Sequence, residues 1–95
     1  MANGNVTLTA NTWVKIADSG LTAVSWQVRS GNTVFVAATS ADSAPAGDVD
    51  GWPVYGSGQG EAGIDATGMF SGVSSAAYLW AYSPGADGEI WRSHA

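Results

Sequence analysis

The sequence predicts an all-β protein: a single small antiparallel β-sandwich, or jelly-roll-like domain, of about seven or eight short strands. Apolar residues recur at every second position in several short segments, which is the period of a half-buried strand. No segment shows the longer period of an amphipathic helix. The 95 residues correspond to one domain, residues 1–95. A domain of this size buries a modest core, so contacts with partner subunits would add stability.

The chain begins with two predicted strands, NVTLTA and TWVKIAD. In the second of them, alternation places Val14 and Ile16 on one face. Trp13 and Lys15 share the opposite face. Residues 1–5 are polar and contain glycine, so we expect them to form a flexible N-terminal arm that precedes the first strand.

Residues 22–39 are predicted to form a β-hairpin. In its first arm Val24, Trp26 and Val28 share one face, while polar residues alternate with them on the other. The Gly31–Asn32 pair is typical of a tight turn, and the segment NTVFVAATS follows as the second arm. The strand periods on both sides of the turn therefore predict two paired strands.

Residues 40–70 are predicted to form a long glycine-rich loop region. The segment holds two of the three prolines and many of the thirteen glycines, which disfavour a helix. A short strand at WPVY would lie at a sheet edge, because Pro53 cannot donate to a ladder. A loop of this length in a small domain is usually functional or ordered by a partner.

The C-terminal part returns to strands. The segment AAYLWAYS is followed by a turn at PGADG and then by EIWRSH, which predicts a second hairpin. Within it Tyr78, Trp80 and Tyr82 share one face. Leu79 and Ala81 make the other face apolar as well, and a strand that is apolar on both faces is buried on both faces.

Residues that would carry catalysis or bind a metal do not form a complete set. The single histidine, His94, is next to last, where chain ends fray and a general base is poorly held. Asp48 and Asp50 look like a fragment of a calcium loop, but the remaining oxygen ligands do not follow. Glu61 and Asp65 are expected to be solvated loop acids. We therefore expect no enzymatic activity, no cofactor and no metal site.

Charge and composition exclude several classes of partner. Charged residues make up only 12% of the chain, and the net charge is −5, so a nucleic acid is not an expected partner. No apolar run is long enough to span a membrane. The start of the chain lacks the basic and apolar regions of a signal peptide, and there are no cysteines for disulfides.

The aromatic side chains are the candidate interaction residues. Trp13, Trp26 and Phe35 lie in strands with apolar neighbours, which assigns them to the core. For the other rings two interpretations stay open: core packing beneath the 40–70 loop, or an interface with another subunit, where Tyr and Trp are favoured. A sugar-binding platform would use exposed rings too, but the sequence identifies no convergent polar set. The candidate interface residues are Trp52, Tyr55, Tyr78, Trp80, Tyr82 and Trp91.

The order of segments resembles a class of small virion proteins of tailed bacteriophages. The likeness covers residues 12–95 and rests on TWVKIADSG, on a hairpin that ends in Ala-Pro, and on a last strand that ends in Ser-His-Ala. Ser19 precedes Gly20 where the opening usually runs directly from Asp to Gly. The resemblance implies a β-sandwich accessory protein without a cofactor, and some members of this class are capsid decoration (cement) proteins.

From this resemblance we expect a capsid decoration protein that is made in the host cytoplasm and binds the outer surface of the virion head. The implied partners are the major capsid protein and further copies of the same chain, in a homo-oligomer such as a trimer. Strand character in the N-terminal arm suggests a capsid-binding segment at Asn3, Asn5, Val6 and Leu8. The alternative is a carbohydrate- or receptor-binding β-sandwich module of a phage tail or another assembly.

Overall fold

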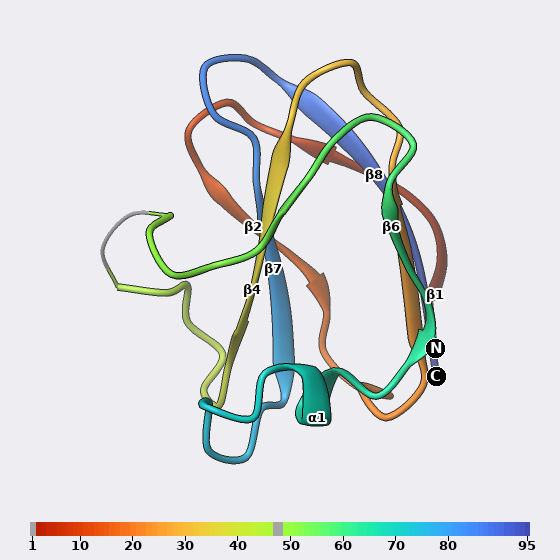
Figure 1. Cartoon of the computed structure of the whole chain (residues 1–95), viewed down its shortest axis with the longest axis vertical. Coiled ribbons are helices and arrows are strands. Elements are labelled where there is room, and N and C mark those ends of the chain that lie inside the picture. The colour runs from red at the N-terminus through yellow and green to blue at the C-terminus, as the bar shows by residue number, and fades with distance from the viewer. Residues whose placement is uncertain (1, 47–48) are drawn as a thin grey trace.

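The computed structural model describes residues 2–46 and 49–95, which form a sandwich of two antiparallel sheets (Figure 1). The β1 sheet contains, in order, β1 (Ala2–Leu8), β8 (Gly88–His94), β3 (Val24–Val28) and β6 (Gly60–Ile64). The β2 sheet contains β2 (Trp13–Ala17), β7 (Tyr78–Tyr82), β4 (Val34–Thr39) and β5 (Val54–Tyr55). A single helical turn, α1 (Ala66–Met69), precedes β7. The prediction of a small all-β sandwich is confirmed.

The strands pair as in a jelly roll. β1 pairs with β8, β2 with β7, β3 with β6 and β4 with β5, so the chain folds as one long antiparallel ribbon that turns between β4 and β5. The ribbon closes on itself through the pairs β3–β8 and β4–β7, which complete two four-stranded sheets. The two ends of the chain lie side by side as a result, with Ala2 opposite His94 (Figure 1).

Both predicted hairpins are wrong. The arms of the 22–39 segment, β3 and β4, lie in different sheets, and so do the two C-terminal strands, β7 and β8. Each pair is joined by an arch that crosses between the sheets, which pack about 10 Å apart. A hairpin and an arch both place a turn between two alternating strands. The local sequence therefore predicted the strands correctly and their partners incorrectly.

The two arches contact each other and close one end of the sandwich. The Asn32 side chain donates a hydrogen bond to the hydroxyl of Ser83, which is fully buried and itself donates to the Ala86 carbonyl at 2.7 Å. Gly88 must lack a side chain here, because a Cβ would lie 2.7 Å from the Ser83 hydroxyl and 3.1 Å from that of Ser30. The first residue of β8 thus leaves room for the polar link between the arches.

The N-terminal arm and the long loop contain more secondary structure than predicted. Residues 2–5 belong to β1, which pairs with β8 along its whole length from Ala2 to Leu8. The 40–70 segment contains β5, β6 and α1. Asp65 caps this helical turn, since its carboxylate accepts the backbone N–H groups of Thr67 and Gly68 at 3.0 and 3.3 Å.

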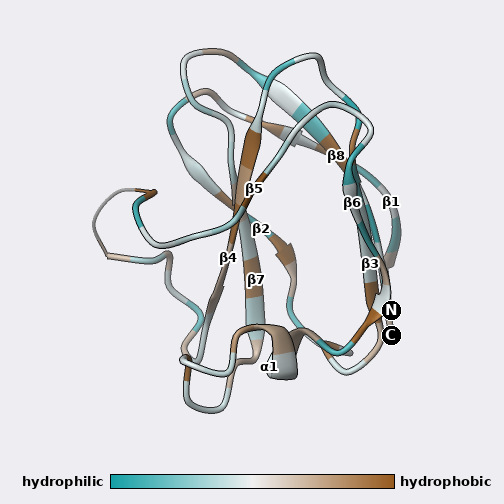
Figure 2. Ribbon diagram, viewed as in Figure 1, coloured by the Kyte–Doolittle hydropathy of each residue, from teal (hydrophilic) through white to brown (hydrophobic). Residues whose placement is uncertain are grey.

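The core lies between the sheets and is filled by every second residue of the strands. Hydrophobic residues recur as bands along the strands in Figure 2, separated by polar turns. Trp26 is the largest fully buried side chain, and its ring meets that of Tyr55 edge-on with centroids 5.8 Å apart. The other fully buried large side chains are Leu8, Val24, Val28, Val34, Val36, Leu79 and Ile90. The assignment of Trp26 to the core is therefore confirmed.

Candidate functional site

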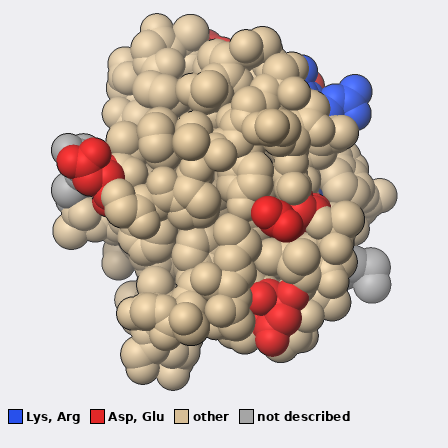
Figure 3. All heavy atoms as spheres, viewed as in Figure 1, with Lys and Arg blue, Asp and Glu red and all other residues tan. Residues whose placement is uncertain are grey.

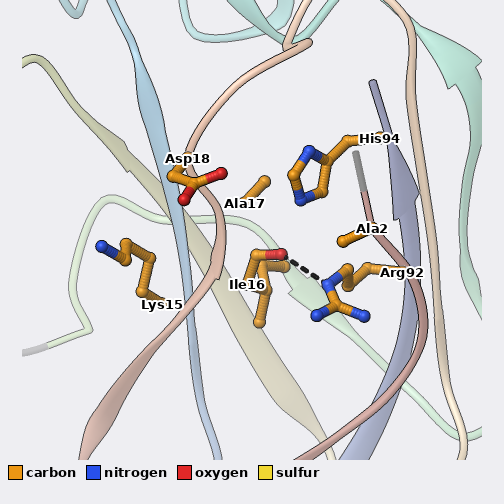
Figure 4. Close-up of a pocket in the computed structure, with 7 residues that line it drawn as sticks. All are labelled: Ala2, Lys15, Ile16, Ala17, Asp18, Arg92 and His94. Carbon is orange, nitrogen blue, oxygen red and sulfur yellow. Dashed lines mark hydrogen bonds between the residues drawn. The ribbon is translucent and has the colours of Figure 1, made fainter.

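A hollow of about 250 Å³ lies at the edge of the sandwich where β1 and β2 face each other (Figure 4). Its lining residues are Ala2, Lys15, Ile16, Ala17, Asp18, Arg92 and His94. The inward side chains of β1 decrease in size toward this end, from Leu8 and Val6 to Gly4 and Ala2. This taper makes room for the side chains of Arg92 and His94, which come from the paired strand β8.

Arg92 links the two sheets across this edge. Its Nε donates to the Ile16 carbonyl of β2 at 2.9 Å (Figure 4). Its Nη1 donates to the Gly4 carbonyl of β1 at 2.9 Å. A Cβ added at Gly4 would lie 3.9 Å from Nη1, so the guanidinium is the nearest group to this backbone position. The geometry gives Arg92 a structural role that holds the open edge together.

His94 is not a frayed surface residue, and that prediction is wrong. It is buried in β8, because β1 covers it through the Ala2–His94 pair. Its Nδ1 lies 3.4 Å from the Ser19 hydroxyl and 3.0 Å from the Ala95 carbonyl oxygen. The Ser19 hydroxyl donates to that same carbonyl at 2.6 Å. Ser19 and His94 therefore both fasten the last residue of the chain.

The carboxylates considered from the sequence are dispersed. Glu61 accepts a hydrogen bond from the Tyr55 hydroxyl at 3.0 Å, and Asp65 caps α1. Asp48 lies outside the described residues, so its arrangement with Asp50 is not placed. Within residues 2–46 and 49–95, no three His, Cys, Asp or Glu side chains come together in a way that could hold a metal ion.

The Tyr55 hydroxyl and the Asp65 carboxylate have shifted pKa values. Burial raises the pKa of the Tyr55 hydroxyl, and the hydrogen bond to Glu61 adds to this increase. The hydrogen bond from the Thr67 side chain lowers the pKa of Asp65, with help from the backbone N–H groups of Thr67 and Gly68. The Tyr55 shift therefore follows mainly from its position in the core, and the Asp65 shift from the hydrogen bonds that cap α1.

The outer side of the β2 sheet carries an aromatic surface, which we call the ring face. It consists of Trp13, Lys15, Phe35, Ala37, Thr39, Val54, Tyr78, Trp80 and Tyr82. Strand pairing places Trp13, Tyr82, Phe35 and Val54 side by side in one row across all four strands. The predicted alternation of β7 is confirmed, because Leu79 and Ala81 belong to the core cluster on the opposite side. Burial on both faces is not complete, since Tyr78 and Tyr82 are only half-buried.

Trp80 is covered by its own chain, unlike the other large residues of the ring face. Only 8% of Trp80 is exposed, and its indole Nε1 donates to the Thr39 hydroxyl at 2.8 Å. Lys15 passes beside it to reach Asp42 at 2.9 Å, with its ammonium 5.5 Å from the centre of the Tyr78 ring. The hydrogen bond to Asp42 raises the pKa of Lys15. The Trp80 ring is therefore packed within this chain and offers little surface to a partner.

The remaining large side chains of the ring face are more accessible. Trp13, Phe35 and Tyr82 are half-buried, and Val54 is 51% exposed. The Trp13 and Tyr82 rings contact each other with centroids 5.2 Å apart. Trp13 and Phe35 thus lie outside the core to which the sequence assigned them. The alternation of β2 and β4, with Ile16 and Val36 facing inward, is the signal that could have placed them here.

Three predicted interface residues lie away from the ring face. Trp52 packs against the core, with its ring 5.9 Å from that of Phe70. Tyr55 is buried within the core beside Trp26. Trp91 lies on the other sheet, where it is half-buried. The structure therefore brings together Tyr78, Trp80 and Tyr82 and separates them from these three.

The outer side of the β1 sheet is mostly uncharged and polar, and we call it the polar face. It consists of Asn3, Asn5, Thr7, Ser25, Gln27, Gly60, Glu89, Trp91 and Ser93. Of the residues predicted to bind a capsid, Asn3 and Asn5 are exposed on this face. Val6 and Leu8 point inward, and Leu8 is fully buried, so neither side chain is presented to a partner.

Comparisons of the chain with models of protein families, with curated proteins and with solved structures found no match. Among the described residues, no helix is long and apolar enough to cross a membrane. Functional conclusions therefore depend on the geometry of the two outer faces and of the edge hollow.

Proposed function

We propose that this protein is a structural assembly subunit that associates with further copies of itself through the ring face. The observation that carries the proposal is the row Trp13–Tyr82–Phe35–Val54, which places three rings and an exposed valine across the whole β2 sheet. Tyr and Trp at the centre of an interface contribute a large part of association energy. A second subunit would remove this surface from water.

The low charge of the chain supports the same proposal. In Figure 3 the acidic side chains appear as separate patches and basic atoms appear at the upper right edge, while most of the visible surface is uncharged. On the ring face Lys15 is the charged residue, and it is already paired with Asp42. Uncharged surface costs less to desolvate than charged surface, so few polar penalties oppose association at this face.

The assembly that we propose is the head of a tailed bacteriophage, on the basis of the sequence resemblance. In this proposal the chain is a decoration protein that binds the major capsid protein on the outer surface and stabilises the shell. β1 is an edge strand, so its free side offers backbone groups to which a neighbouring strand can be added. In this proposal attachment runs along the β1 edge, because residues 2–8 pair with β8.

Mass in solution, measured with and without purified tailed-phage capsid shells, tests the proposal. We expect the mass from sedimentation equilibrium to rise with concentration to that of a closed oligomer in the micromolar range. We also expect the protein to co-sediment with the shells. A monomer at all concentrations would contradict self-association, and an oligomer that ignores the shells would contradict the capsid assignment alone.

A further inference from the structure

A second hollow, of about 370 Å³, lies on the polar face beside Trp91. It is bounded by Trp91 of β8, by Ser25 and Gln27 of β3, and by Gly58, Gly60, Glu61 and Ala62 toward the β6 edge. The volume is at the lower end of the range of about 300–1,000 Å³ that is usual for small-molecule sites. This hollow is on the opposite side of the sandwich from the ring face.

Trp91 supplies one wall of the hollow. It is half-buried, and no other aromatic ring of the described residues packs against it. The strand pairing places it in one row with the side chains of Asn5 and Gln27. A single ring is thus flanked by an amide on each side, at the spacing of about 4.8 Å between neighbouring strands.

The polar groups of the hollow are held in place by hydrogen bonds. The Gln27 Nε2 donates to the Gly58 carbonyl at 3.2 Å, which leaves the amide oxygen available to accept. The Ser25 hydroxyl oxygen accepts the Gly63 N–H at 2.8 Å, which leaves its proton available to donate. Both residues lie on β3, an interior strand of the sheet, so the positions of their side chains are fixed by the fold.

Gly60 keeps the floor of the hollow open. A Cβ at this position would lie 1.9 Å from the Trp26 carbonyl oxygen, so a side chain cannot be accommodated without displacing β6 from β3. The row Asn5–Trp91–Gln27 therefore ends at bare backbone rather than at a fourth side chain. Beyond Gln27 the row therefore presents only the backbone of Gly60.

We propose that this hollow binds a sugar ring of a neutral glycan. A pyranose has a C–H face that packs on an aromatic ring, and its rim of hydroxyls both donates and accepts hydrogen bonds. Amide and hydroxyl side chains complement that rim because they also do both. The proposal concerns a different face from the proposed subunit interface and does not depend on it.

The surrounding chemistry favours a neutral sugar over other ligands. The charged groups near the hollow are acidic, because Glu61 lines it and Glu89 lies on the polar face. Together with the net charge of −5 they disfavour anionic glycans and nucleic acids. An apolar partner would displace the water that is hydrogen-bonded to the amides of Asn5 and Gln27. It would offer those amides no hydrogen bonds in return. Neutral hydroxyls satisfy those groups at the least cost.

The probe is a panel of neutral hexasaccharides built from glucose, mannose, galactose, xylose and N-acetylglucosamine. Binding is followed through the backbone N–H signals of Ser25 and Gln27 in the ¹⁵N-labelled protein, which every variant retains, and also through the indole N–H signal of Trp91 in the wild type. The sugar is added up to about 10 mM, above the roughly 1 mM dissociation constant of a weak site. We expect a saturable shift with at least one member. Trp91→Ala should weaken that binding about tenfold or more, whereas Trp91→Phe should retain most of it.

Trp13→Ala is the matched control, because it removes the same side chain from the opposite sheet. We expect its affinity for the sugar to stay within about twofold of the wild type, since separate sites are independent. The proposal is overturned if no member of the panel shifts the Trp91 signal. It is also overturned if Trp91→Ala binds as tightly as the wild type, or if only an anionic polymer such as dextran sulfate binds.

Discussion

On the outside of the β2 sheet, the interior strand β7 presents Tyr78, Trp80 and Tyr82, whereas on the outside of the β1 sheet its counterpart β8 presents Glu89, Trp91 and Ser93. Both strands alternate in the same way and both contribute inward residues to one core. The difference lies only in their outward positions. A jelly roll therefore offers two independent surfaces, and here one is suited to another protein surface and the other to a hydroxyl-rich ligand.

The largest expected difference between the faces concerns their central tryptophans. Trp80→Ala should lower the free energy of unfolding by about 3–5 kcal/mol, because the ring is almost fully covered by its own chain. Trp91→Ala should cost about 1 kcal/mol or less, because its ring is partly exposed. Urea unfolding of both variants measures this difference. Equal losses would show that the two faces are covered to the same extent.

This comparison shows what the sequence could and could not predict. The period of two located the strands outside the 40–70 segment but missed β6, which was predicted to be loop. It placed Tyr78, Trp80 and Tyr82 on one side correctly, because alternation is a local property. The same alternation would have placed Trp13 and Phe35 on the outer face. Their apolar neighbours led instead to their assignment to the core. Alternation is thus a better guide to the face of a ring than the hydrophobicity of adjacent residues.

Strand partners could not be predicted in the same way. The connection that contains Gly31 and Asn32 is compatible with a tight hairpin, and its actual path depends on Ser83, which lies 51 residues from Asn32. The burial of His94 likewise depends on pairing with Ala2 at the other end of the chain. The polar set around Trp91 was missed for this reason, since Asn5, Gln27 and Trp91 become neighbours only through the sheet.

A substitution at Gly60 should disturb the polar face selectively. Gly60→Ala places a Cβ against the Trp26 carbonyl, so β6 must move away from β3, at a cost of about 1–3 kcal/mol. Gly31→Ala is the matched control, because nothing lies within 4 Å of the added Cβ. Thermal unfolding should show a lower midpoint for Gly60→Ala and little change for Gly31→Ala. A stable Gly60→Ala protein would contradict the close approach of β6 and β3.

A smaller effect is expected from Tyr55, whose hydroxyl joins β5 of one sheet to Glu61 of the other. Its pKa is raised in the folded state, so its contribution is fully present below the unfolded value of about 10 and decreases as the pH rises above it. Above about pH 10, the free energy of unfolding of Tyr55→Phe should therefore fall less steeply with pH than that of the wild type. Urea midpoints between about pH 8 and 11 test this, and parallel curves for the two proteins would contradict it.

Self-association through the ring face is tested most directly by one added charge on each face. Val54 is 51% exposed on the edge strand β5, and Asn3 is exposed on the edge strand β1. Sedimentation velocity at micromolar concentrations should show that Val54→Asp shifts the protein toward monomer, because an unpaired charge would be buried in the interface. Asn3→Asp should retain the wild-type oligomer. If both variants keep the wild-type sedimentation coefficient, or if Asn3→Asp alone dissociates the oligomer, the ring face is not the subunit interface.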